Sequence, residues 1–239
     1  MTKEILIPIP DFDFDLTEVS IPWKYFRDNG FNVTFSTENA NIGKTDTLLI
    51  SGVLFGQLGA KKESIETYYK LEKEPEFLNP IKYSDIIPEK YDLILLAGGH
   101  AKGMRQYLES KILQEKVLEF FNRKKIIGSI CHGPIVLSRT INPENNKSII
   151  YGKKLTALTK QLEMTAYFLT FWLRGDYYRT YPEYVQDEIS RNLSNKDNFK
   201  IGDSMWKPFY VEDENLITSR WPNDVDLFSK KLIEKLQIN

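Results

Sequence analysis

The only cysteine of the chain and one of its two histidines are neighbours, as Cys131 and His132. A thiolate is a strong nucleophile, and an imidazole beside it can accept the thiol proton. An apolar run precedes the pair and Gly133 and Pro134 follow it, which predicts a strand, a sharp turn and a helix. Such a turn lifts the sulfur clear of the strand, and the start of the helix favours its thiolate. We therefore interpret Cys131 as a nucleophile and not as a buried, inert cysteine.

A second candidate site segment, Gly98, Gly99 and His100, directly follows the apolar residues 91–97. Ligands of open parallel sheets bind beyond the carboxyl ends of the strands, and glycines allow backbone N–H groups to approach a substrate oxygen as an oxyanion hole. A tight turn without a chemical role would also place glycines here, so both interpretations remain open. His100 is more typical of a structural histidine, or of one at the rim of such a site, than of a catalytic base.

The composition excludes several other kinds of site. The 239 residues include 32 Lys and Arg against 33 Asp and Glu, and this balance argues against nucleic-acid binding. One cysteine cannot form an intramolecular disulfide, which predicts a reducing, cytoplasmic location, and a Cys/His metal site is disfavoured. The apolar stretch at 164–173 is far shorter than the roughly 20 residues that cross a bilayer, so we expect no membrane span. Residues 1–10 carry too few apolar side chains before the first aspartates for a secretory leader, so we expect none.

Hydrophobic periods of two and of 3.6 residues alternate along the chain, which is typical of an α/β protein. We predict a doubly wound, mainly parallel sheet, a flavodoxin-like sandwich with peripheral helical insertions, formed by a single domain over residues 1–239. The predicted strands are residues 4–8, 31–36, 91–97, 125–130 and 215–219, and the predicted helices are 18–29, 110–123, 134–139 and 225–236. Residues 154–158 are also strand-like.

Two stretches, at about residues 43–80 and 164–208, do not fit this alternation and are interpreted as insertions. The first predicts a loop with a peripheral helix. The second is rich in aromatic residues, and Phe168, Phe171 and Trp172 recur at helical spacing. An amphipathic helix packed on the domain is the simpler interpretation of these rings, and the lining of a substrate entrance is the alternative.

Two segments, YDLILLAGG at 91–99 and IGSICHGP at 127–134, resemble the ThiJ/PfpI family of the class I glutamine amidotransferase-like fold. Residues 17–19 and 216–220 are similar to further family segments in the expected order. Residues 156–163 resemble the T-G-F-T-x-x-x-E stretch of the fungal heat-shock-type branch. The resemblance covers most of the chain, about residues 3–35, 85–163 and 210–236, and it implies a homodimer.

Carried over residue by residue, the resemblance implies that Cys131 is the nucleophile and that His132 is its base. Glu163 would orient the imidazole of His132, and Glu18 would hold a carboxyl group against the sulfur. Gly99 would donate its backbone N–H to the oxyanion. The sequence alone would also allow Glu18 to be an ordinary acidic residue in the first turn of a helix.

The family resemblance implies several activities. These are glutathione-independent glyoxalase or deglycase action on small reactive carbonyls, amidase or peptidase action, and a non-catalytic stress or redox-sensing, chaperone-like role. Glutamine amidotransferases have their catalytic histidine far downstream of the cysteine, and no histidine follows His132. We therefore predict a cysteine-dependent enzyme of the glyoxalase type that acts on a small molecule without a cofactor. A small-substrate hydrolase and a redox sensor are the alternatives.

Overall fold

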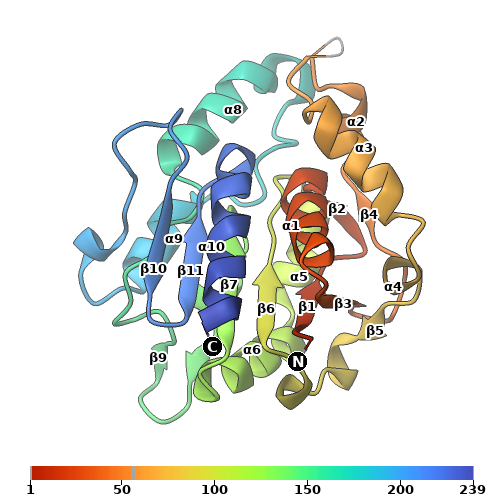
Figure 1. The fold of residues 1–239 in the computed structure, drawn as a ribbon. Helices are drawn as coiled ribbons and strands as arrows, with labels where there is room; N and C mark the ends of the chain where they lie inside the picture. Colours follow the sequence, from red (N-terminus) through yellow and green to blue (C-terminus); the bar gives the residue numbers. More distant parts are fainter. Residues whose placement is uncertain (1, 55–56, 239) are drawn as a thin grey trace.

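The computed structural model describes residues 2–54 and 57–238, and a seven-stranded sheet crosses this part of the chain (Figure 1). The strand order is β10-β11-β7-β6-β1-β3-β5, and neighbours pair in parallel except β10 with β11. The strands are β1 (Glu4–Pro8), β3 (Asn32–Thr37), β5 (Ile81–Lys82), β6 (Leu93–Leu96), β7 (Ile126–Ile130), β10 (Tyr210–Asp213) and β11 (Leu216–Ser219). Two small ladders join β2 (Phe12–Phe14) to β4 (Lys44–Thr45) and β8 (Ile141–Asn142) to β9 (Lys147–Ser148).

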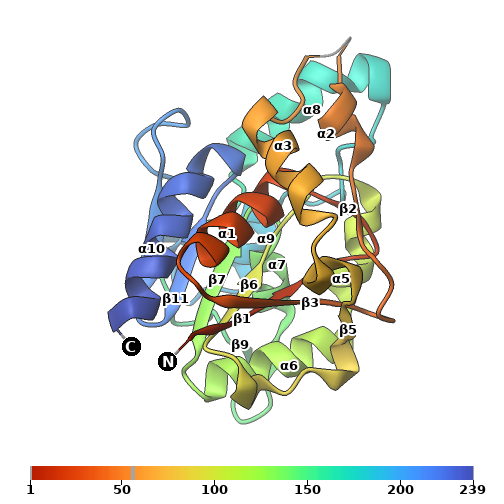
Figure 2. The same ribbon diagram turned by 45° about the vertical axis from the view of Figure 1, so that its right-hand side comes forward.

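Helices cover both faces of the sheet, which buries β6, β7 and β11 completely. Figure 2 shows α1 and α10 on one side and α5 and α6 on the other. Strands covered on both faces are apolar along their whole length, as the sequence of β6 illustrates. The helices are α1 (Leu16–Asp28), α2 (Thr47–Ser51), α3 (Lys62–Leu71), α4 (Pro75–Leu78), α5 (Arg105–Glu109), α6 (Lys111–Asn122), α7 (Pro134–Arg139), α8 (Lys160–Arg174), α9 (Val185–Arg191) and α10 (Val225–Ile238). The predicted α/β architecture is confirmed.

Helix α1 begins at Leu16, two residues before the predicted start. Asp15 caps it, because the carboxylate accepts hydrogen bonds from the backbone N–H groups of Thr17 and Glu18. Pro22 lies inside this helix. The predicted strand at 154–158 is wrong, since this segment makes only an isolated bridge between Leu155 and Phe199.

Helices α2 and α8 lie beyond the carboxyl ends of the central strands, at the top of Figure 1, and we call these two helices the cover. The guanidinium of Arg174, at the end of α8, donates hydrogen bonds to the carbonyl oxygen of Val53, just after α2. The cover falls largely within the two predicted insertions, although α8 starts four residues earlier than the second one, at Lys160. In the described part of the chain, no helix is long and apolar enough to span a bilayer.

The aromatic residues of α8 do not pack on the rest of the protein as predicted. Phe168, Phe171 and Trp172 are 57%, 46% and 59% exposed. Helix α8 instead buries Leu162, Glu163 and Thr170. The spacing of the rings predicted the helix correctly, but it could not show which face of the helix turns inward.

Candidate active site

The turn that follows β7 places Cys131 in a strained backbone conformation. Its φ is +61°, in the left-handed region that residues other than glycine seldom adopt. Backbone hydrogen bonds hold the turn, from Cys131 N–H to the oxygen of Ser219 at 3.2 Å and from Gly133 N–H to the oxygen of Ile130 at 2.9 Å. A Cβ at Gly133 would lie 2.1 Å from the carbonyl oxygen of Leu96, so only glycine fits there. This geometry is that of a nucleophile elbow.

A chain of hydrogen bonds sets the protonation of His132. The hydroxyl of Thr180 donates to the carbonyl oxygen of His100, so its oxygen is left to accept from His132 Nε2–H at 3.2 Å. The imidazole therefore carries its proton on Nε2, and the lone pair of Nδ1 faces Cys131 Sγ at 3.4 Å. His132 is arranged to accept the thiol proton.

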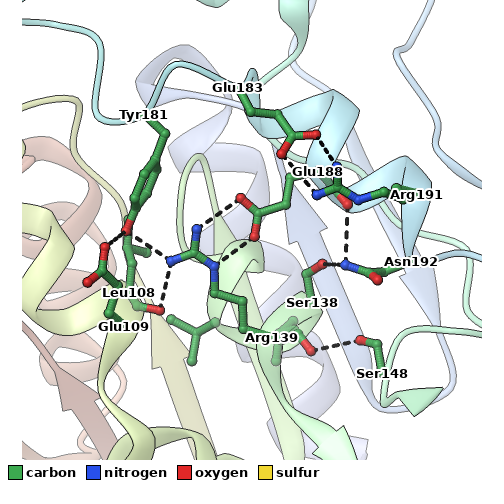
Figure 3. A network of polar contacts seen from close by, with 12 residues as sticks. Leu108, Glu109, Ser138, Arg139, Ser148, Tyr181, Glu183, Glu188, Arg191 and Asn192 are labelled. Carbon is green, nitrogen blue, oxygen red and sulfur yellow. Dashed lines mark hydrogen bonds and ion pairs between the residues drawn. The ribbon is translucent and has the colours of Figure 1, made fainter. Parts of the chain in front are cut away.

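Thr180 is held in place by the residue that follows it and by its own backbone. The hydroxyl of Tyr181 accepts a hydrogen bond from Arg139 at 2.9 Å and donates one to Glu109 at 2.8 Å (Figure 3). Arg139 also pairs with both carboxylate oxygens of Glu188, at 2.7 and 3.0 Å. In addition, Arg105 Nε donates to the carbonyl oxygen of Thr180 at 2.7 Å. Helices α5, α7 and α9 thus fix the segment that orients His132.

Glu18 lies fully buried in the first turn of α1, with its carboxyl group against the cysteine. Its Oε2 accepts a hydrogen bond from Gly98 N–H at 2.8 Å, and the same carboxyl group interacts with the Cys131 thiol. Burial, followed by the nearby charge of Asp15, raises the pKa of Glu18 well above its usual range. Glu18 therefore holds a proton that it can share with the sulfur.

Burial also sets the charge of the Cys131 and His132 pair. It raises the pKa of the Cys131 thiol, and the adjacent Glu18 adds to that effect. Burial and then His100 lower the pKa of His132 well below its usual value. The pair therefore rests as thiol and neutral imidazole. Our expectation that the start of the helix favours the thiolate is wrong for this resting state, because burial outweighs the effect of a six-residue helix.

The turn after β6 brings Gly98, Gly99 and His100 to the same place, and we call residues 98–100 and 131–133 the floor. A Cβ at Gly98 would lie 2.6 Å from His132 N and 2.7 Å from Cys131 Cβ, so the two turns touch through this glycine. The N–H of Gly98 already donates to Glu18. The prediction that Gly98 donates to an oxyanion is therefore wrong. No described residue accepts a hydrogen bond from Gly99 N–H, so this group is the better candidate. The ring of His100 lies 5.0 Å from that of His132.

Glu163 does not occupy the place that the family resemblance implied. Its Oε2 accepts a hydrogen bond from Val185 N–H at 3.0 Å, whereas both ring nitrogens of His132 bond to Cys131 and Thr180. Glu163 is nevertheless buried, and burial raises its pKa to about 7. In the described structure the orienting group opposite Nε2 is therefore the hydroxyl of Thr180.

Two residues of this site were missed in the sequence. Thr180 lies in an irregular segment without a motif, so no local signal marks it. Asp15 could have been found, because an aspartate three residues before Glu18 is a good helix cap. Burial raises the pKa of Asp15 to about 6, and its backbone N–H donates to Gly98 O at 2.8 Å.

The floor could also hold a metal ion. One ligand atom from each of His100, Cys131 and His132 lies within 4.8 Å of the others. A thiolate and two imidazole nitrogens suit Zn²⁺. An ion bound there would occupy the sulfur and the Nδ1 lone pair, so it would block the nucleophile, and assays of this site need a chelator.

Comparisons with known proteins identify the family and the fold. A model described as ThiJ/PfpI family-like matches residues 9–202. A glutathione-independent glyoxalase of Schizosaccharomyces pombe, hsp3102, is 32% identical over 150 residues, which are 60% of this chain and 59% of that protein. Glyoxalase 3 of Candida albicans is 24% identical over 60% of this chain and 59% of its own length. The crystal structure of glyoxalase III from Candida albicans matches with a TM-score of 0.75 at 19% identity, over 99% of this chain and 98% of that one.

Proposed function

Because the chain belongs to the ThiJ/PfpI-like family, and relatives named glutathione-independent glyoxalases support this type of activity, we propose that it converts 2-oxoaldehydes to 2-hydroxy acids through Cys131. One observation carries the proposal. The hydrogen bond from Thr180 to His100 fixes the proton of His132 on Nε2 and leaves Nδ1 facing the thiol at 3.4 Å.

The first step is addition of the thiol to the aldehyde. His132 Nδ1 takes the S–H proton while sulfur forms a bond to the aldehyde carbon, and the proton then moves to the carbonyl oxygen to complete a hemithioacetal. In this mechanism Gly99 N–H would donate a hydrogen bond to the developing oxyanion. Because the resting thiol is neutral, this addition depends on the transfer of the proton to His132.

The second step moves hydrogen between the two carbons of the substrate. A base removes the C1 proton to give an enediol, and a proton returns at C2, which yields a thioester of the 2-hydroxy acid. Water then cleaves the carbon–sulfur bond of the thioester, releasing the acid and restoring the thiol. His132 and Glu18 are the groups available for these transfers, since each can hold a proton next to the sulfur. Overall, one water molecule is added and no external oxidant is needed.

A redox-sensing role finds less support in this site. Oxidation of cysteine follows thiolate character, and burial raises the pKa of the Cys131 thiol, which disfavours the thiolate at rest. A hydrolase would use the same nucleophile and base, but no described feature favours an amide or peptide substrate over an aldehyde.

The test measures the acid product from methylglyoxal with the wild type and with Cys131→Ser, in buffer with EDTA. We expect the wild type to form lactate and the variant to be at least about a thousandfold slower, since the nucleophile is lost. Equal rates would overturn the mechanism. Absence of lactate from the wild type would overturn the proposed function.

A further inference from the structure

A cavity of about 430 Å³ lies between the floor and the cover. Asp15, His100 and Leu158 line it on the floor side. Two of them contact the catalytic pair: Leu158 N–H donates to Cys131 O at 3.0 Å, and the rings of His100 and His132 are 5.0 Å apart. The cavity therefore lies beside the catalytic pair, and neither Cys131 nor His132 is part of its described lining.

The opposite walls of this cavity are mainly apolar. The cover contributes Leu49, Leu162 and Leu169, and the loops beside it contribute Met205, Trp206 and Trp221. Leu169 and Trp206 are 47% and 72% exposed, so this wall of the cavity presents apolar surface to water. Polar side chains such as Lys61 and Asn223 also reach the cavity, but as a minority of the lining.

The size of the cavity exceeds what the smallest 2-oxoaldehyde requires. Cavities of about 300–1,000 Å³ accommodate drug-sized ligands, whereas methylglyoxal carries only one methyl group beyond its two carbonyls. Such a substrate would leave the walls formed by Leu169, Met205 and Trp206 without a contact. An apolar tail would cover them and leave water in doing so.

We propose that this site acts on 2-oxoaldehydes that carry an aliphatic chain or an aromatic ring, with the two carbonyls toward Cys131 and the tail against Leu169, Met205 and Trp206. The proposal rests on the proposed function and specifies its substrate. Each buried methylene contributes about 0.8 kcal/mol, which is about a fourfold gain in kcat/KM. A homologous alkyl series is the appropriate probe because all its members share the same reacting carbonyls.

The experiment compares kcat/KM for methylglyoxal, propylglyoxal and hexylglyoxal. We expect hexylglyoxal to exceed methylglyoxal by at least about tenfold. Leu169→Ser should reduce that ratio about fivefold or more. The matched control is Leu173→Ser, which changes a leucine on the same helix that is 41% exposed and lies off the cavity lining, and it should leave the ratio unchanged. A flat or falling series, or equal effects of the two variants, would overturn the proposal.

A binding measurement separates failure of this inference from failure of the proposed function. An alkyl 2,3-diketone lacks the aldehyde hydrogen and cannot isomerise, and two of the four tryptophans line the cavity. Quenching of tryptophan fluorescence in Cys131→Ser by 2,3-butanedione and 2,3-octanedione therefore reports occupancy without turnover. We expect the longer diketone to bind at least about tenfold more tightly, and equal affinities would overturn the inference. Absence of acid from every oxoaldehyde would overturn only the proposed function.

Discussion

The floor of the site and its cover are held together in different ways. The floor residues Cys131 and His132 and the adjoining Glu18 have no exposed surface, and each makes polar contacts with a neighbour. In the cover, α8 leaves aromatic rings in water and is tied to the α2 side through the bonds from Arg174 to Val53. Chemistry depends on distances that cannot vary, whereas an apolar wall works over a range of shapes. We infer that the floor carries the reaction and that the cover selects the substrate.

Among substitutions that leave the nucleophile in place, we expect Gly98→Ala to disturb the geometry of the floor most. The added Cβ would lie within 2.6–2.8 Å of His132 N, Cys131 Cβ and Glu18 Oε2, so all three groups must shift. We expect kcat/KM to fall at least about a hundredfold, because a displacement of about 1 Å in a catalytic constellation has that effect. The free energy of unfolding should fall by about 1–3 kcal/mol.

Gly152→Ala is the matched control for this change, since a Cβ there meets no heavy atom within 4 Å. Its kcat/KM and its denaturation midpoint should stay close to those of the wild type. If Gly98→Ala behaved like Gly152→Ala, the close approach of the two turns would have no catalytic importance.

A smaller effect is expected from Thr180→Val, which removes the hydroxyl that orients His132. The imidazole can then place its proton on Nδ1, where it cannot accept from the thiol. We expect kcat to fall by about ten- to a hundredfold, which is part of the usual contribution of a general base, and Thr180→Ser to restore it. Nitrogen-15 NMR of His132 should show a change of tautomer in the valine variant. An unchanged tautomer would show that Thr180 has only a packing role.

The smallest effect on activity is expected from Glu163→Gln, which tests whether this carboxylate belongs to the floor. Its bond to Val185 N–H can pass to the amide oxygen, so kcat should change less than about threefold. A loss of a hundredfold or more would instead support the orienting role that the family resemblance implied.

The same variant has a pH-dependent effect on stability. Burial raises the pKa of Glu163 from 4.5 to about 7, so the folded state holds this proton more tightly than the unfolded chain does. The stability that this proton provides is present below pH 4.5 and is lost as the pH rises to about 7. The free energy of unfolding of Glu163→Gln should therefore exceed that of the wild type by about 1–3 kcal/mol at pH 8 and by little at pH 4.5, as measured by urea unfolding. A difference that does not vary with pH would contradict the raised pKa.

The fold was predictable because its central strands are apolar along their length and its helices show clear starts and stops. Strand β1 and helix α7 have the bounds that their residues predicted. The site turns follow because β6 ends at Leu96, shortly before Gly98, and β7 ends at Ile130, directly before Cys131. The pairing of Cys131 with His132 needed no tertiary information, since the two residues are adjacent in the chain.

The remaining site features depend on contacts between distant segments. Thr180 meets His132 across 48 residues, and it is held there by contacts of Arg139 with Tyr181 and of Arg105 with its own carbonyl oxygen. The role expected for Glu163 required its side chain to point to His132, but α8 turns it toward Val185 instead. The predicted protonation state of Cys131 was wrong for a related reason. Motif and helix position predict a thiolate, while the depth of burial, which raises the thiol pKa, is a property of the folded chain alone.

The division of roles between floor and cover can be tested in one set of measurements, kcat/KM for methylglyoxal and for hexylglyoxal in Cys131→Ser and in Leu169→Ser. We expect Cys131→Ser to lower both values by the same large factor, because it removes the nucleophile that both substrates use. We expect Leu169→Ser to lower the value for hexylglyoxal about fivefold or more and to leave the value for methylglyoxal nearly unchanged. This account would be contradicted by a Cys131→Ser protein that retains activity, or by a Leu169→Ser protein in which kcat/KM falls equally for both substrates.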